Sequence, residues 1–203
     1  MQKKPRTAAE VEAAIRAAVL AELAEGGYAA VTYEGIARRV GTSKPVLYRR
    51  FPDRASMIFD AMRSRAAVGK LEATTGSLRG DLLTLMRRAH DKTTRYGPAA
   101  YRALVGDARE ETLAQAAALA VDAVPRIEQV VLTPARERGE LGPLPLDPDV
   151  VLAPMRLARD RIIFGTFTEA DVLTIVDKVA IPLFRAASGL GVVDRAPDPG
   201  ARA

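Results

Sequence analysis

The 203-residue sequence contains no cysteine, no tryptophan and a single histidine, His90. Without cysteine, the chain cannot form disulfides, hold zinc through thiolates or use a cysteine nucleophile. One histidine also rules out nearly every histidine-based metal site or catalytic triad. These absences argue against an enzyme, so we expect no catalytic residue, no metal and no cofactor.

The sequence also lacks long apolar segments. No stretch approaches the roughly 20 uncharged apolar residues that a membrane-spanning helix needs. The basic start of the chain, Met1–Arg6, has no apolar segment of the kind found in secretory signals. We therefore expect a cytoplasmic protein that does not enter a membrane.

The excess positive charge is confined to the N-terminal third. The chain carries 30 Lys and Arg against 25 Asp and Glu, a net charge of +5. Residues 1–65 contain 12 basic and 7 acidic side chains, so they account for the whole excess. A polyanionic partner such as DNA would meet this part of the chain. A solvated basic face that binds nothing gives the same count.

Helix-forming residues dominate the sequence. Alanine is abundant, alternating β-branched residues are scarce, and glycine or proline marks the breaks, a pattern that predicts an all-α fold of about nine helices. Apolar residues recur every four positions in residues 8–25 and predict an amphipathic first helix. Gly26-Gly27 would end this helix, because glycine accepts the left-handed conformation that closes helices.

Two short predicted helices follow the first one. They span residues 33–39 and 44–50 and are separated by Gly41, which makes a helix-turn-helix. Thr32 is placed to cap the first of them, and either Thr42 or Ser43 is placed to cap the second. Neither helix is long enough to be stable alone, so both must pack on the first helix.

The residue types in these two helices predict one buried and one exposed face. The buried face would consist of Ile36, Ala37, Val40, Val46, Leu47 and Phe51. Lys44, Tyr48 and Arg49 would then project in the opposite direction. In a helix-turn-helix the second helix enters the major groove, and hydroxyls and amides around it bind phosphates.

Further helices are predicted along the rest of the chain. We expect them at about residues 53–73, 81–95, 98–108, 110–138, 148–164 and 168–187, with a kink at Pro125. Asp53 and Asp147 would act as N-caps, and Thr168 with Asp171 resembles a capping box. The Gly/Pro-rich residues 188–203 are expected to form a disordered tail.

Residues 8–62 resemble the TetR family of bacterial transcriptional regulators. The tract V-G-T-S-K-P-V-L-Y-R-R-F, residues 40–51, is similar to the family pattern V-S-x-G-T-L-Y-x-H-F. Pro45 and Val46 depart from it by replacing a small residue and a threonine. Arg50 replaces a common histidine, and Arg54 stands where the family usually has lysine. The resemblance implies a three-helix DNA-binding domain over residues 1–65.

By this resemblance, DNA contacts are expected at Thr32, Thr42, Ser43, Lys44, Tyr48, Arg49 and Arg54. Thr32, Tyr48 and Arg54 would bind phosphate, although Thr32 also suits a plain N-cap and Tyr48 a tyrosine at the edge of the core. Thr42 and Ser43 would contact phosphate or a base edge, or simply cap the second short helix. Lys44 and Arg49 would reach guanine or phosphate, or form a solvated pair. Pro45 and Val46 would contact a thymine methyl or simply stiffen the turn. Lys3, Lys4 and Arg6 form a basic arm that lies along the minor groove or stays solvated.

The rest of the chain resembles, more weakly, the C-terminal domains of part of this family. The likeness lies in A-Y-R-A-L-V-G-D-A-R, residues 100–109, and R-G-E-L, residues 138–141. It implies that residues 66–187 form a helical effector-binding and dimerisation domain, with a two-fold interface on the last two long helices. The last helix also has more apolar surface than one intrachain face needs, at Val172, Ile175, Val176, Val179 and Leu183.

Six inward-facing residues are candidates for the lining of an effector pocket. They are Met86, His90, Tyr96, Tyr101, Leu104 and Met155. Each of them also suits an ordinary core position. A mostly apolar pocket of this kind would take a hydrophobic or aromatic small molecule.

Together these observations predict a homodimer that binds a palindromic operator in double-stranded DNA. Two recognition helices one turn of DNA apart, roughly 34–36 Å, read a palindrome that one helix cannot specify. We expect a repressor that a small-molecule effector releases from its operator. A non-specific architectural DNA-binding protein and an activator on the same fold are the alternatives.

Overall fold

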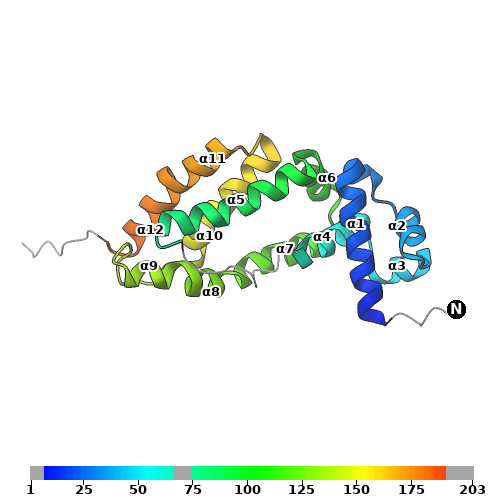
Figure 1. Cartoon of the computed structure of the whole chain (residues 1–203), viewed down its shortest axis with the longest axis horizontal. Coiled ribbons are helices and arrows are strands. Elements are labelled where there is room, and N and C mark those ends of the chain that lie inside the picture. Colours follow the sequence, from blue (N-terminus) through cyan, green and yellow to red (C-terminus); the bar gives the residue numbers. More distant parts are fainter. Residues whose placement is uncertain (1–6, 66–74, 191–203) are drawn as a thin grey trace, which may run out of the picture.

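The structure is a computed structural model, and it describes residues 7–65 and 75–190. Within these residues the chain forms helices and no strand, which confirms the all-α prediction. When helices that continue through a π turn or through the break at Ala123 are counted as one, the described chain has nine helices. The molecule is elongated, with α1 (Ala8–Ala30) near one end and the last helix running toward the other (Figure 1).

Residues 7–65 form the part of the molecule that we call the head. After α1 come α2 (Tyr33–Val40), α3 (Lys44–Arg50) and α4 (Arg54–Arg65). Thr7 and Glu10 cap α1 through a capping box, which satisfies two of its unpaired N–H groups. α1 packs against α2 and α4, and α2 packs against α3. α1 therefore supports α2 as the sequence predicts, whereas α3 is held mainly through α2.

Two glycines with positive φ direct the chain through the head. Gly27 has φ 69° and interrupts α1, but helical geometry resumes and ends at Ala30 rather than at the predicted Gly26-Gly27. Gly41 has φ 73° and ends α2 as predicted, with its N–H donating to the carbonyl of Ala37. A side chain would disfavour the left-handed conformation at both positions.

The core of the head is made by the apolar face that the sequence predicts. Ile36, Ala37, Val40, Leu47 and Phe51 are all buried, and Val46 is half-buried. They pack around the buried residues of α1, among them Ile15, Val19 and Leu23. Leu47 is completely inaccessible and anchors α3 to the head.

The C-terminal domain begins, within the described residues, with α5. Its elements are α5 (Leu78–Tyr96), α6 (Pro98–Asp107), α7 (Glu110–Asp122), α8 (Val124–Ile127), η2 (Glu128–Leu132), α9 (Thr133–Glu137), α10 (Pro148–Phe164), α11 (Glu169–Thr174), η3 (Ile175–Ala180) and α12 (Ile181–Ala187). None of the helices within residues 7–65 and 75–190 combines the length and the apolar character needed to span a membrane.

Side-chain caps determine where several of these helices begin. α5 starts three residues earlier than predicted because the Ser77 hydroxyl accepts a hydrogen bond from the N–H of Gly80 at 3.1 Å. The caps predicted from the sequence are confirmed at the starts of α4, α10 and α11, at Asp53, Asp147 and Thr168. The capping box between Thr168 and Asp171 is complete.

Prolines interrupt the longer C-terminal helices. The break predicted near Pro125 lies between α7 and α8, at Ala123. Pro134 and Pro182 each follow a π-helical segment, η2 and η3 respectively. Proline has no N–H, and its ring clashes with the carbonyl four residues earlier, so a wider turn accommodates it. The sequence pattern gave no indication of these two π segments.

Part of the apolar surface of the last helix is covered within the chain. Val172, Ile175 and Val176 are buried in the C-terminal core, because α11 and η3 pack against α5 and α10. Assigning these three residues to a contact with a second chain is therefore wrong. Val179 and Leu183 are half-buried and keep exposed apolar surface.

The C-terminal domain extends further than the predicted tail boundary at residue 188. Ser188 is fully buried, and its hydroxyl accepts a hydrogen bond from the N–H of Gly142 at 2.8 Å. Its carbonyl accepts another from the N–H of Leu144 at 3.1 Å. These bonds attach the loop before α10 to the end of α12, so the packed domain reaches Leu190. The rest of the predicted tail, 191–203, lies outside the described residues.

Two apolar cores meet where the head joins the C-terminal domain. Tyr96 and Ala100 come from α5 and α6, yet they belong to the core of the head. Tyr101 of α6 packs against both cores. A division of the sequence near residue 65 therefore does not separate the two parts in space.

Candidate nucleic-acid interface

Hydroxyl side chains lie at the N-terminal ends of α2 and α3. Thr32 is the N-cap of α2, and its hydroxyl accepts a hydrogen bond from the N–H of Gly35 at 3.0 Å. Ser43 is at the N-cap position of α3, but its side chain makes no capping hydrogen bond. Thr42 beside it is half-buried. The Ser43 hydroxyl is thus available to a phosphate at a helix N-terminus.

α3 has one exposed face that carries most of the predicted DNA contacts. Among the residues predicted to contact DNA, Lys44, Pro45, Tyr48 and Arg49 are exposed on α3. Tyr48 is 56% exposed although the adjacent Leu47 is fully buried. Val46 is half-buried, which suits packing of the turn at least as well as contact with a base. The predicted arm residues lie outside the described residues; these are Lys3, Lys4 and Arg6.

Tyr48 is supported by a second tyrosine that the sequence analysis did not single out. The rings of Tyr33 and Tyr48 stack, with centroids 4.1 Å apart and planes inclined by 23°. The Tyr33 hydroxyl donates to the carbonyl of Phe51 at 2.8 Å, which fixes the Tyr33 ring. Burial raises the pKa of Tyr33 to about 12, so this hydroxyl keeps its proton at neutral pH. The stack holds Tyr48 outward, toward solvent.

Most cations of the head are already paired with acids of the same chain. Among the side chains of residues 7–63, ion pairs are made by Arg16, Arg39, Lys44, Arg50, Arg54 and Arg63. Within the same residues, Arg38 and Arg49 have no such pair and are both exposed. Arg49 was predicted to contact DNA, whereas Arg38 was not. The only sequence signal for Arg38 was the net charge of the N-terminal third.

Arg54 lies at the junction with the C-terminal domain. Its guanidinium stacks over the ring of Tyr28 at 4.1 Å and forms an ion pair with Asp107, at 2.7 Å between Nη2 and Oδ2. These partners occupy the side chain that we expected to meet a phosphate. The sequence did not indicate them, because Asp107 is far along the chain. The phosphate contact of Arg54 stays a prediction.

The residues predicted to line an effector pocket are divided between the two cores. Met86 is fully buried in the C-terminal core, and Met155 packs against it. Tyr96 and Leu104 pack instead with the head. Tyr101 bridges the two groups. The candidates are thus distributed over two packed cores, and their role in an effector pocket stays a prediction.

The sixth candidate, His90, packs edge-on against Phe167 just before α11, with ring centroids 5.8 Å apart.

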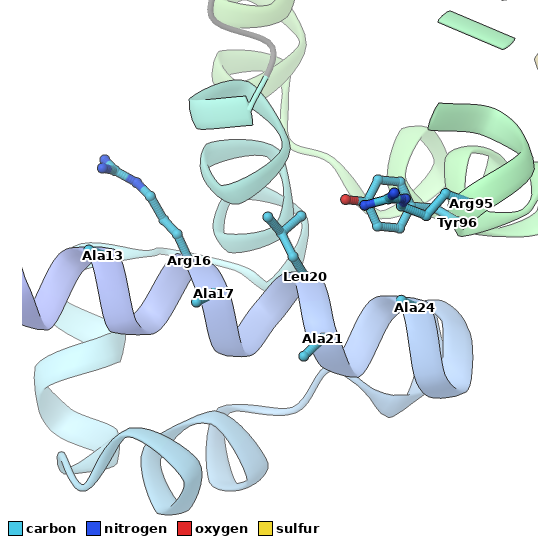
Figure 2. A pocket seen from close by; sticks show the side chains of 8 residues that line it. All are labelled: Ala13, Arg16, Ala17, Leu20, Ala21, Ala24, Arg95 and Tyr96. Atoms are coloured by element: carbon cyan, nitrogen blue, oxygen red, sulfur yellow. The ribbon is translucent and has the colours of Figure 1, made fainter. Parts of the chain in front are cut away.

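A groove of about 550 Å³ lies elsewhere, between α1 and the C-terminal end of α5, as Figure 2 shows. Of the six candidates, Tyr96 alone lines it. The other lining residues are Ala13, Arg16, Ala17, Leu20, Ala21, Ala24 and Arg95.

The short helices, the glycine turn and the exposed face of α3 define a helix-turn-helix DNA-binding protein. Residues 15–61 match the family model described as bacterial regulatory proteins, tetR family. Residues 72–179, more than half of the chain, match the model of the tetracyclin repressor-like C-terminal domain. The chain therefore belongs to the TetR family of transcriptional regulators, which confirms the resemblance seen in the sequence.

Full-length relatives agree with this assignment. The chain is 26% identical over 181 residues to uncharacterised HTH-type transcriptional regulators of Mycobacterium bovis and of two strains of Mycobacterium tuberculosis. The alignments cover 88% of this chain and 90% of each relative. The similarity thus extends through both the head and the C-terminal domain.

Changing Tyr48 to Phe tests whether its hydroxyl binds DNA. The ring and its stack on Tyr33 are retained, so we expect the fold and the thermal midpoint to be unchanged. Loss of one hydrogen bond to a phosphate should weaken DNA binding by about 1–2 kcal/mol on every sequence. Fluorescence anisotropy with a specific and a random-sequence duplex measures this.

Arg49→Ala serves as the contrasting variant. If Arg49 reads a base, its loss lowers affinity for the specific duplex more than for the random one. Equal losses on both duplexes would reduce Arg49 to a phosphate contact. A Tyr48→Phe protein that binds both duplexes as tightly as the wild type would contradict the role of the hydroxyl.

Proposed function

We propose that this chain is a homodimeric repressor that binds a palindromic DNA operator and is released from it by a hydrophobic or aromatic small molecule. The observation that carries the proposal is the exposed face of α3, where Lys44, Tyr48 and Arg49 surround the buried anchor Leu47. One such face reads a short sequence. A second head one turn of DNA away, roughly 34–36 Å, supplies the missing specificity.

Exposed apolar side chains on the last two long helices support a dimer. Phe164, at the end of α10, is 83% exposed, and Leu173 of α11 is 37% exposed. Val179 and Leu183 are half-buried. Apolar surface of this kind is unfavourable in water and favours burial by another chain. We place the two-fold interface on α10 and on the helix from α11 to α12.

A polar cluster at the junction supports coupling between the C-terminal domain and the head. The Oδ2 atom of Asp107, at the end of α6, accepts hydrogen bonds from Arg54 at 2.7 Å and from the Tyr28 hydroxyl at 3.0 Å. Arg109 forms an ion pair with Asp53, the N-cap of α4, at 3.3 Å. Burial is the main cause that raises the pKa of Tyr28 to about 12, so it stays a donor. A shift of α6 therefore acts directly on the start of α4.

This geometry suggests how an effector would release the DNA. A ligand that binds one packing of the C-terminal helices more tightly stabilises that packing. The junction then moves α4 and changes the separation of the two recognition helices. A coupling free energy of about 1–3 kcal/mol lowers operator affinity roughly 5–150-fold.

The first test is binding to DNA from upstream of the chain's own coding region. We expect binding that survives an excess of random-sequence competitor at two salt concentrations, with two chains per site. Fluorescence anisotropy and a stoichiometric titration measure both. If the competitor abolishes binding to the upstream DNA and the affinity falls steadily as salt is raised, the result would favour an architectural DNA-binding protein. Transcription with and without the protein distinguishes a repressor from an activator.

The proposed interface predicts that Phe164→Ser weakens the dimer. Because the side chain is almost fully exposed in one chain, its replacement should leave the folded protomer intact. Each of two symmetric copies loses about 1.5–3 kcal/mol of apolar burial. Sedimentation equilibrium should show a marked shift toward the monomer. Leu113→Ser, at a 43% exposed position on α7, is the matched control, and equal behaviour of the two variants would contradict the interface.

The junction predicts that Asp107→Asn uncouples effector binding from DNA release. The change keeps the shape of the side chain and removes the charge that Arg54 contacts. A compound that displaces wild-type protein from its operator should still bind the variant but release it less, by roughly a factor of 5 or more. Calorimetry measures compound binding, and anisotropy measures release. Asp91→Asn, at an exposed position of α5, controls for the loss of charge, and full release of the Asp107 variant would contradict the coupling.

A further inference from the structure

Glu34 is an acidic side chain within the basic surface formed by α2 and α3. It lies in the first turn of α2, two residues after the N-cap Thr32, and its side chain is 67% exposed. Its Oε2 atom accepts a hydrogen bond from Nζ of Lys44 at 2.9 Å. Lys44 is the first residue of α3. The contact therefore joins the N-terminal ends of the two helices of the helix-turn-helix.

Two cations keep Glu34 ionised. The hydrogen bond from Lys44 is the largest cause that lowers the pKa of Glu34, and the charges of Lys44 and Arg38 lower it further. Arg38 lies one turn further along α2 and has no ion pair within the described side chains of residues 7–63. Glu34 is thus negative at neutral pH, and it accepts a hydrogen bond of the kind that Lys44 would donate to a phosphate.

Folding stability does not explain why this acid reaches α3. Both partners are largely solvated, with the Lys44 side chain 49% exposed, and an exposed ion pair adds little to stability. Thr32 already caps α2 through the N–H of Gly35. A negative charge in the first turn of α2 interacts favourably with the helix dipole. That interaction does not require the Glu34 side chain to reach a neighbouring helix.

We propose that Glu34 competes with DNA phosphate for Lys44 and so lowers the affinity of the head for DNA. In the free head, the phosphates of DNA of any sequence compete with the Glu34 carboxylate for Lys44. Binding to random DNA and binding to the operator are therefore weakened by similar factors. Base contacts from the exposed face of α3 keep the operator bound despite this loss. The inference rests on DNA binding by the head, as proposed above.

The test compares full-length Glu34→Gln with the wild type on a short duplex of random sequence. Glutamine keeps the length of the side chain and removes its charge. We expect the variant to bind this duplex roughly three- to tenfold more tightly at low salt, with a salt dependence steeper by about one unit of slope. Anisotropy titrations at several salt concentrations measure both quantities. Unchanged affinity and slope would overturn the proposal.

Glu25→Gln is the matched control for the change in net charge. Glu25 is 64% exposed and pairs with Arg39, on the last turn of α2, instead of a residue of α3. We expect this variant to bind the random duplex within about twofold of the wild type, because its acid does not occupy a cation of the recognition helix. A gain equal to that of Glu34→Gln would show that net charge alone is responsible.

A second pair of variants tests whether Glu34 acts through Lys44. The gain from Glu34→Gln should fall below about twofold when it is measured in a Lys44→Gln background, since the competed cation is absent. A full gain in that background would assign the effect to general repulsion of DNA and overturn the proposal.

Binding to the operator separates failure of this inference from failure of the function. Glu34→Gln should bind the operator and the random duplex more tightly by similar factors, because Lys44 is freed from Glu34 in both cases. A wild-type protein that binds neither duplex would contradict DNA binding itself. Wild-type binding with unchanged affinities in the variant would contradict only the role of Glu34.

Discussion

The whole DNA-binding surface depends on burying one face of two helices that are too short to fold alone. α2 has eight residues and α3 has seven, so both depend on packing within the head, α2 against α1 and α3 against α2. Leu47 is completely buried, and this burial turns its neighbours Tyr48 and Arg49 to the solvent. The same helix orientation thus sets both the packing of the head and the side chains that we expect to contact DNA. Tyr33 adds to it by stacking on Tyr48 while its hydroxyl is tied to the backbone.

The head is continuous with the C-terminal domain. Tyr96 and Ala100 complete the core of the head from α5 and α6, so the two parts share apolar contacts. The carboxylate of Asp107 joins the end of α6 to Arg54 at the start of α4. Both kinds of contact cross the same junction, and the coupling proposed above between the C-terminal helices and the head would act through it.

Charge in the head is largely compensated inside the chain. The N-terminal third carries the net positive charge, yet within the described side chains most of its cations are held by acids. Arg38 and Arg49 are the exposed cations of residues 7–63 without such a partner, and Lys44 is shared with Glu34. Residues 7–63 contain eight basic and seven acidic side chains, so the rest of the excess charge of the N-terminal third lies at Lys3, Lys4, Arg6 and Arg65.

The all-α class, the position of the helix-turn-helix, the family resemblance and the caps at Thr32, Asp147 and Thr168 could all be predicted from the sequence. These features depend on residues within a few positions of one another, where periodicity and capping act. The folded arrangement was needed to find the partners of Arg54 and Lys44, the stack of Tyr33 on Tyr48, the burial of Ser188 and the distribution of the pocket candidates over two cores. Such contacts join residues that are distant along the chain, and local propensity contains no information about which distant surface each side chain will meet.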